Sequence, residues 1–314
     1  MLSAYDEKGN LFHLLDEIPP KQTFTCPACK APVRLKNGQV MRAHFAHVSM
    51  ADCHFHYENE SAEHLNLKAG LYQSLSKTQE IEIEKVLPAL NQIADLMVNQ
   101  KLAVEVQCSR LSEKRLQERT AAYHNHGFRV LWLLGENLWL GGKISSLQKQ
   151  FLYFSQNMGF HYWELDEKKR EIRLKYLIYE DWQGKLYWLT KSCSFEEDVF
   201  NFFRLPYQKQ YLSSYQVKQD QRLLIYIQKQ LMIRNPYWLK RQEEMYLQGN
   251  NLLARNLEDY FPQVRPIESI SGFCQIEQDL LEFQTTFFQY YQKQEHKQDQ
   301  ILYPPAFYGK MVRK

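Results

Sequence analysis

Cysteines and histidines at short, regular spacings lie near the start of the chain. Two residues separate Cys26 from Cys29, and two separate His44 from His47. A structural zinc ion takes four thiolate or imidazole ligands in a tetrahedron, which two such pairs supply when a hairpin folds between them. A redox pair would need a thioredoxin-like βαβ context, and these residues lack it. We therefore predict a structural Zn²⁺ site formed by Cys26, Cys29, His44 and His47, with Cys53 as the alternative to one histidine.

Acidic residues form a second candidate site near the middle of the chain. Asp95 lies in one expected strand, and Glu105 and Gln107 lie two positions apart in the next, on one face of it. Converging carboxylates repel each other unless a cation or a proton relieves them. Mg²⁺ or Mn²⁺ suits such oxygen ligands, and either ion can activate water and stabilise charge on a phosphate. A solvated sheet face is the alternative interpretation of these residues taken alone.

The elements around the acids alternate between helical and strand patterns. Asn59 or Ser61 can cap a first helix, and Ser112 a second one. Strict alternation over residues 80–84 predicts a strand with one solvated face, and the apolar run 130–134 predicts a strand buried on both faces. The expected order is helix 63–75, strands 80–84, 93–98 and 102–107, helix 113–127 and strand 130–134.

The first 57 residues indicate a small β-rich module. Residues 33–36 alternate in polarity, Asn37 and Gly38 follow, and residues 40–42 continue the pattern. An Asn-Gly pair between such segments is typical of a type I′ hairpin turn, whose two central positions both need a positive φ. The turn would bring the histidine pair back to the cysteine pair, as in a zinc ribbon.

With these motifs in place, the chain resembles a known family. The αβββαβ order with Asp95 and Glu105-Val-Gln107 is similar to the restriction-endonuclease-like, or PD-(D/E)XK, nuclease core. More closely, residues 20–140 resemble the bacterial competence proteins CoiA. The stretches that carry this resemblance are Cys26-Pro-Ala-Cys29, His44-Phe-Ala-His47, Glu63-His64-Leu-Asn-Leu-Lys68, Asp95, Glu105-Val-Gln107-Cys-Ser109 and Phe128-Arg-Val-Leu-Trp132.

The resemblance assigns roles to individual residues of the middle region. Asp95 and Glu105 would bind Mg²⁺ or Mn²⁺, and Glu63 would be the third acid of the metal shell. Gln107 stands where the nuclease pattern usually has lysine, and Lys68 on the first helix is the candidate to replace that charge. His64, Ser109 and Arg119 are the candidates for contacts with nucleic acid.

The resemblance also implies a function. It implies natural transformation, in which incoming single-stranded DNA is recombined into the chromosome, with DNA as the partner and recombination proteins as further candidate partners. One hypothesis is a metal-dependent DNA phosphodiesterase, that is, a nuclease. The other is a platform of nuclease fold that binds DNA or a recombination partner without useful cleavage. The acids favour the first hypothesis, and glutamine in the lysine position favours the second.

The aromatic residues concentrate after residue 150. From Tyr207 to Tyr246 they alternate with Lys, Arg and Gln, an arrangement that can hold a single strand by stacking and phosphate pairing. A helical domain with aromatics in its core is the other interpretation. Residues 234–241 are the best candidate for a true basic-aromatic contact. A glycine-rich phosphate loop is missing, so nothing in the sequence supports an ATP-driven role.

Composition limits the remaining possibilities. The 314 residues carry 39 basic and 36 acidic side chains, so a nucleic-acid surface must be a local patch. The longest apolar run, residues 130–134, is far below the roughly 20 residues that span a bilayer, and we expect a cytoplasmic protein without membrane contact. We predict an α+β fold in three parts: a zinc-ribbon-like module (1–57), a nuclease-like domain (58–142) and a mostly helical, aromatic-rich domain (143–314).

Overall fold

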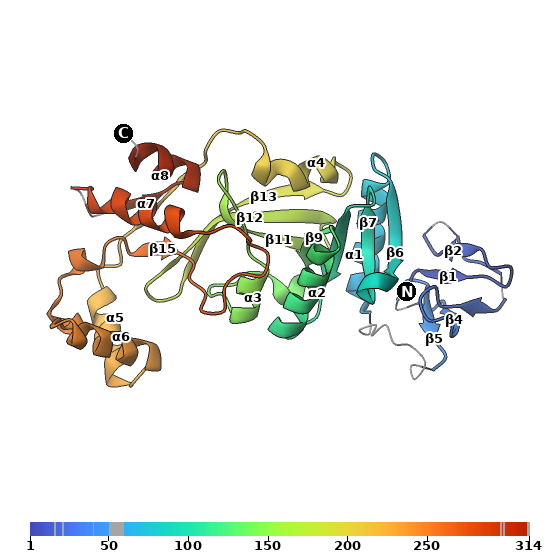
Figure 1. Cartoon of the computed structure of the whole chain (residues 1–314), viewed down its shortest axis with the longest axis horizontal. Coiled ribbons are helices and arrows are strands. Elements are labelled where there is room, and N and C mark those ends of the chain that lie inside the picture. Colours follow the sequence, from blue (N-terminus) through green and yellow to red (C-terminus); the bar gives the residue numbers. More distant parts are fainter. Residues whose placement is uncertain are drawn as a thin grey trace.

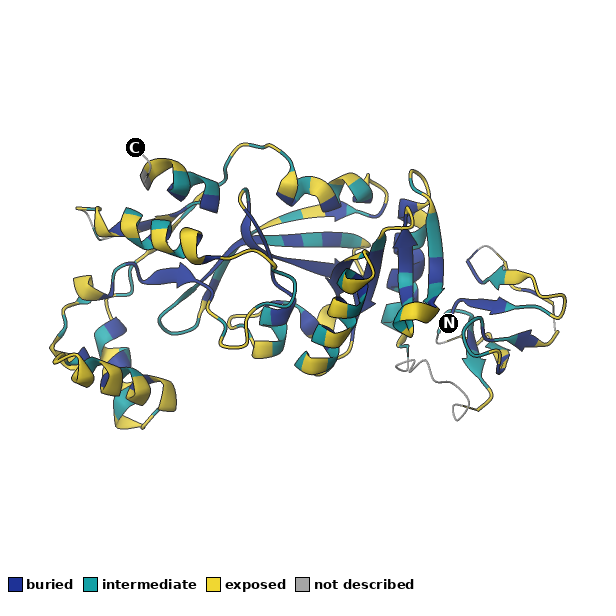
Figure 2. Ribbon diagram, in the orientation of Figure 1, coloured by how far each residue is buried: buried dark blue, intermediate teal, exposed yellow. Residues whose placement is uncertain are grey.

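The computed structural model describes residues 1–15, 17–20, 22–39, 41–49, 60–295, 297 and 299–312. Figure 1 shows an elongated molecule with a small sheet at one end, a large sheet in the middle and helices at the other end. The strands of the central sheet are largely buried, and exposed residues lie on the helices and loops around it (Figure 2). This arrangement confirms the predicted α+β class.

The N-terminal module is a five-stranded antiparallel sheet with strand order β2-β1-β3-β4-β5. Lys36 at the end of β4 pairs with His44 at the start of β5, so the hairpin between them exists. Its connection spans residues 37–43, and Gly38 does not take a positive φ. The predicted two-residue turn is therefore wrong. The strands are β1 (Ser3–Tyr5), β2 (Leu11–His13), β3 (Phe24–Thr25), β4 (Pro32–Lys36) and β5 (His44–His47).

The predicted helix and strand order of the middle region is confirmed. Ser61 caps α1 by accepting a hydrogen bond from the His64 amide, and Ser112 caps α2 by accepting one from the Arg115 amide. Asn59, the other cap candidate, lies outside the described residues. The elements are α1 (Ala62–Leu75), β6 (Ile81–Leu87), η1 (Pro88–Leu90), β7 (Gln92–Val98), β8 (Leu102–Gln107), α2 (Glu113–Asn125) and β9 (Arg129–Leu134).

The central sheet continues past the domain boundary that we expected at residue 142. Its order is β13-β12-β11-β9-β8-β7-β6, with β10 paired to β11 and β15 to β12. The expectation of a mostly helical region after this boundary is thus wrong for residues 153–194, where strict alternation over residues 171–176 is the strand signal. The added elements are η2 (Glu136–Leu138), α3 (Ser146–Gln150), β10 (Tyr153–Ser155), β11 (Gly159–Asp166), β12 (Glu171–Asp181) and β13 (Leu186–Ser194).

Helix α1 packs against the residue that follows β13. A Cβ atom on Gly70 would lie 2.9 Å from the ring of Phe195, so only glycine allows this close approach. The first helix of the nuclease-like region therefore shares its packing with residues beyond 142. These strands and that helix form one layered unit.

The two faces of the central sheet carry different helices. The Trp132 indole of β9 donates a hydrogen bond to Thr120 of α2, and Trp163 of β11 packs on Phe202 and Phe203 of α4. Because β9 pairs with β11 through Leu134 and Glu164, strand alternation points Trp132 and Trp163 to opposite sides. Glu105, the acid of β8, faces the α2 side, since it pairs with Trp132 in the register.

The remaining chain is mainly helical, as predicted for the C-terminal part. Its elements are α4 (Val199–Arg204), η3 (Leu205–Tyr207), β14 (Tyr215–Lys218), α5 (Leu223–Met232), α6 (Pro236–Leu247), η4 (Leu252–Ala254), η5 (Leu257–Tyr260), β15 (Val264–Pro266), α7 (Leu281–Gln292), β16 (Asp299–Leu302) and α8 (Pro305–Val312). Within the described ranges, no helix has the length and apolar character needed to cross a membrane.

Candidate active site

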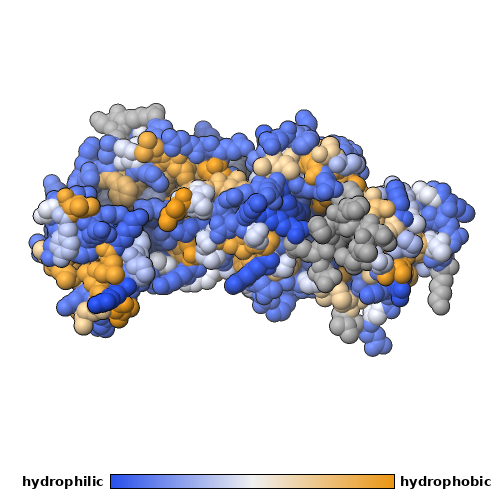
Figure 3. Space-filling model, turned by 60° about the horizontal axis from the view of Figure 1, so that its bottom comes forward, coloured by the Kyte–Doolittle hydropathy of each residue, from blue (hydrophilic) through white to orange (hydrophobic). Residues whose placement is uncertain are grey.

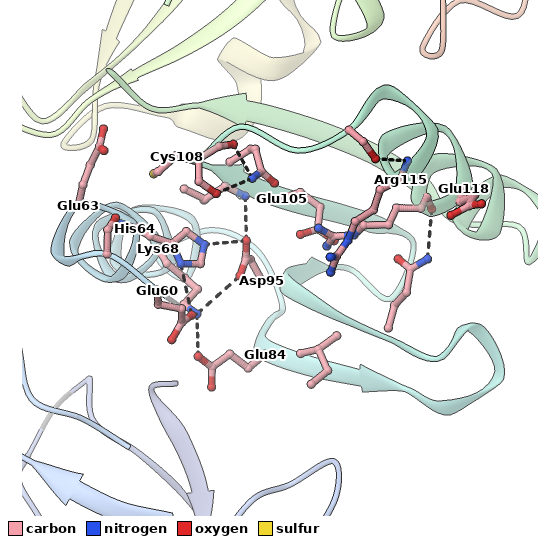
Figure 4. Close-up of a pocket in the computed structure, with 18 of the residues that line it drawn as sticks. Glu60, Glu63, His64, Lys68, Glu84, Asp95, Glu105, Cys108, Arg115 and Glu118 are labelled. Carbon is pink, nitrogen blue, oxygen red and sulfur yellow. Dashed lines mark hydrogen bonds and ion pairs between the residues drawn. The ribbon is translucent and has the colours of Figure 1, made fainter. Parts of the chain in front are cut away.

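An open cavity of about 940 Å³ lies between α1, the ends of β7 and β8, and α2. Figure 4 shows side chains from all four elements pointing into it. Every residue that the sequence assigned to the catalytic site lines this cavity, although Glu63 lies apart from the other acids. Its lining includes Glu63, His64, Lys68, Asp95, Glu105, Gln107, Ser109 and Arg119.

Asp95 and Glu105 lie next to each other on neighbouring antiparallel strands. The ladder between β7 and β8 includes the pair Leu96 and Val104, and Asp95 and Glu105 are the next residues outward. The ladder ends there, and the Val106 amide instead donates to Oδ2 of Asp95 over 2.9 Å. The side chain of Asp95 thus occupies the place where strand pairing stops, at the wall of the cavity.

Two cationic side chains of α1 reach Asp95. His64 Nε2 lies 3.1 Å from Oδ2 and Lys68 Nζ lies 3.6 Å from Oδ1. Burial alone would raise the pKa of Asp95, but the charges of His64 and Lys68 hold it well below its usual range. Burial alone would likewise lower the pKa of His64, whereas Asp95 and Glu60 raise it to about 9. The histidine is therefore an imidazolium at neutral pH.

Lys68 is the most buried charged group of the site, with 1% of its surface exposed. Its ammonium group donates to Glu60 and, over 2.7 Å, to Oε1 of Glu84. Burial would lower the pKa of Lys68, but Glu60, Glu84 and Asp95 hold it well above its ordinary value. One ammonium thus connects three carboxylates (Figure 4).

Glu105 has its own partners on α2. The Tyr123 hydroxyl donates to Glu105 Oε1, and the Arg119 guanidinium lies 2.9 Å from the same oxygen. Burial raises the pKa of Glu105, and the charge of Arg119 offsets this only in part. Arg119 also lies over the Trp132 ring, 4.9 Å from its centroid, and is fixed by both contacts.

Gln107 and Ser109 lie together at the edge of the cavity. The Gln107 side-chain amide donates to the Ser109 carbonyl over 2.8 Å and to the Ser109 hydroxyl over 3.3 Å. Gln107 therefore presents a neutral amide in the place where the resemblance would put a lysine. Positive charge reaches this cavity from α1 and α2 instead.

Glu63 lies apart from the other acids. Its Oε1 accepts a hydrogen bond over 2.7 Å from the Glu136 amide, which lies just beyond the C-terminal end of β9. Figure 4 shows the Glu63 side chain pointing away from Asp95. The carboxylates that share a cation with Asp95 are instead Glu60 and Glu84, which our sequence reasoning missed. Glu60 stands four and eight positions before His64 and Lys68, a helical spacing that could have indicated it.

The N-terminal cluster contains three of the predicted zinc ligands. Suitable ligand atoms of Cys26, Cys29 and His47 all lie within 4.8 Å of one another, and Cys29 Sγ is 3.3 Å from His47 Nε2. Burial lowers the pKa of His47, which favours the neutral imidazole that a metal needs. This cluster fits the expected zinc-ribbon-like module.

His44 does not join these three residues. It is three positions from His47 in the same strand, and an odd separation puts the two side chains on opposite faces. Its Nδ1 instead lies 2.9 Å from the Arg42 carbonyl oxygen. Cys53, the alternative ligand, lies outside the described residues.

Residues 234–241, the candidate basic-aromatic contact, form the turn between α5 and α6 and the start of α6. Trp238 is 2% exposed and belongs to a small core with Leu223 and Ile227, whereas Tyr237 is 48% exposed. The Arg241 guanidinium lies 4.5 Å from the Trp182 ring centroid. Figure 3 shows orange hydrophobic residues beside blue hydrophilic ones at this end of the molecule. The aromatics here are partly core, and Tyr237 with its basic neighbours stays available for a contact.

Comparisons with known proteins agree with this architecture. The family model "Competence protein CoiA, nuclease-like domain" matches residues 60–187, and "Competence protein CoiA, N-terminal domain" matches residues 12–56. The Competence protein CoiA of Bacillus subtilis (strain 168) is 32% identical over a match of 161 residues. This match covers 48% of this chain and 41% of that relative. The match thus spans less than half of the relative's length. No solved structure matches the chain.

The charge on His64 predicts a pH-dependent stability of the metal-free protein. Because its folded pKa of about 9 exceeds the unfolded value, its contribution is complete below pH 6.5 and is lost as the pH rises through 9. We expect the free energy of unfolding to fall by about 2–3 kcal/mol more in the wild type than in His64→Gln between pH 6.5 and 9.5. Urea unfolding in EDTA measures this, and parallel curves for the two proteins would contradict it.

Proposed function

The chain belongs to the competence protein CoiA family, and from that membership we propose that it acts in natural transformation as a Mg²⁺- or Mn²⁺-dependent DNA phosphodiesterase. Asp95 and Glu105 would bind the ion. The proposal rests on one observation above all: these two acids directly follow the last paired residues of the adjacent strands β7 and β8, and both line one open cavity. Its site in the cell would be the cytoplasm, and its substrate single-stranded DNA or a recombination intermediate.

The donor chemistry of the cavity suits such an ion. Carboxylate oxygens are the ligands that Mg²⁺ and Mn²⁺ prefer, and the cavity leaves room for water and phosphate beside them. When bound, the ion would lower the pKa of a water molecule and neutralise charge on the phosphate. His64, Lys68 and Arg119 would give up their present contacts to the acids as the ion enters.

The same cations then have a role in the reaction. Water adds to phosphorus, the bond from phosphorus to the leaving strand's oxygen breaks, and that oxygen takes up a proton. Negative charge grows on the non-bridging oxygens during this step, and preorganised donors stabilise it. Lys68 and Arg119 supply positive charge from the two sides of the acids, and Gln107 and Ser109 can orient the phosphate by hydrogen bonds.

One observation favours a second candidate function. Asp95 and Glu105 each have a cationic side-chain partner, and Gln107 supplies no charge of its own. A site neutralised in this way could bind DNA or a recombination protein as a platform without cleaving it. The two functions differ in whether the acids are needed for turnover or only for folding.

We further propose that Cys26, Cys29 and His47 bind a structural Zn²⁺ ion. Support comes from the turn over residues 26–30. The Lys30 amide donates to the Cys26 carbonyl over 3.0 Å, and Lys30 itself has a positive φ of 61°. This turn brings the Cys26 and Cys29 thiols to one side. Two thiolates and one imidazole leave one position of a tetrahedron to fill. Cys53 remains the proposed candidate for that position.

Cleavage of labelled DNA tests the nuclease. We expect wild type to cut single-stranded DNA with Mn²⁺ or Mg²⁺, and Asp95→Asn or Glu105→Gln to reduce the rate at least about 100-fold, since each removes a metal ligand. Glu118→Gln is the matched control, because Glu118 lines the same cavity but pairs only weakly with Lys114. DNA binding without cleavage by the wild type would favour the platform, and equal cleavage by all variants would point to a contaminant.

Metal analysis tests the zinc site. We expect about one zinc per purified chain, lost in Cys26→Ser, Cys29→Ser and His47→Ala, because each change removes one ligand. Cys193→Ser, which changes a buried thiol outside the cluster, and His44→Ala should both retain it. Retention of zinc in Cys29→Ser, or its loss in His44→Ala, would contradict the ligand set.

A further inference from the structure

The three acids Glu84, Asp95 and Glu105 lie at one level of three consecutive strands. Between β6 and β7 the pairs on either side of Glu84 keep a constant register, so Glu84 is opposite Asp95. On the other side, Asp95 and Glu105 are the residues that follow the last pair of the β7–β8 ladder, Leu96 with Val104. A row of carboxylates across neighbouring strands is unstable without cations between them.

Glu84 adopts an unusual backbone conformation in this row. Its φ is 53°, a left-handed value that a non-glycine residue rarely takes within a strand. No residue is inserted at this point, since the register is the same before and after it. Such local strain persists only where surrounding contacts hold it, and it is common at functional sites.

Both oxygens of the Glu84 carboxylate have partners on other elements. Oε1 accepts from Lys68 Nζ and from the Leu2 amide, each over 2.7 Å, and Oε2 accepts from the Ser3 amide over 2.9 Å. Leu2 and Ser3 are buried and belong to the N-terminal module. One buried carboxylate therefore joins that module, strand β6 and the ammonium beside Asp95.

We propose that Glu84 is a positioning residue for Lys68. It holds the Lys68 ammonium beside Asp95, where the proposed reaction needs a positive charge that Gln107 does not carry, and it ties this charge to the backbone of the N-terminal module. The inference rests on the proposed function and adds to it a residue that acts through Lys68. Without Glu84 the ammonium keeps Glu60 but loses the contact that fixes it from the β6 side.

Glu84→Gln is the variant that tests this role, and Glu82→Gln is its matched control. Glu82 lies two positions earlier in the same strand, but it is partly exposed and pairs with Lys85. In metal-free protein, nitrogen-15 NMR should show a slowly exchanging Lys68 ammonium signal, assigned by its absence in Lys68→Arg. We expect this signal in wild type and Glu82→Gln, and its loss in Glu84→Gln, together with at least tenfold faster exchange of the Ser3 amide.

Turnover gives the second readout. We expect Glu84→Gln to lower kcat about tenfold or more with KM for DNA unchanged, because Lys68 would act in the transition state and not in substrate binding. Glu84→Asp, which keeps the charge but shortens its reach, should give a smaller loss of kcat and serves as the test if Glu84→Gln folds poorly.

A retained Lys68 signal or an unchanged kcat in Glu84→Gln would overturn the positioning role. A wild type that cleaves nothing would contradict the proposed function, while the Lys68 signal would still decide whether Glu84 holds the ammonium.

Discussion

Carboxylates concentrated at one level of a buried sheet need positive charge close by, and the structure depends on how that charge is supplied. Lys68 places one ammonium among Glu60, Glu84 and Asp95, and Arg119 covers Glu105 from the opposite helix. An uncompensated buried charge costs several kcal/mol, so removing one partner of these contacts would strongly destabilise the fold. Lys68 belongs to α1 and Arg119 to α2, so both helices supply positive charge to the acids.

This arrangement also defines what the cavity can do. In the proposed function the acids would offer oxygen ligands to the ion, and the cations that now neutralise them would be free to contact the phosphate. The N-terminal module takes part, because the Leu2 and Ser3 amides donate to the Glu84 carboxylate that also holds Lys68.

Local patterns were enough to predict the central elements, and the family resemblance named many of the residues that line the cavity. Capping serines, strand alternation and the Asp95 and Glu105 spacing depend on neighbours in sequence. The partners of the acids could not be predicted in this way, since Glu84 meets Lys68 only through the sheet register and its own left-handed backbone. Alternation did contain the information that His44 and His47 face opposite ways, but the motif spacing alone suggested a pair. The strands after residue 142 were missed although aromatic residues favour strands and residues 171–176 alternate strictly in polarity.

The central claim is that Asp95 and Glu105 together bind the ion that acts on DNA. A crystal structure with Mn²⁺ and a short single strand tests it most directly, because the anomalous signal locates the ion without assuming its ligands. The account predicts a peak at about 2.0–2.3 Å from a carboxylate oxygen of each acid, with Lys68 and Arg119 moved onto the phosphate. A structure in which both cations stay on the acids and no peak lies between them would contradict it.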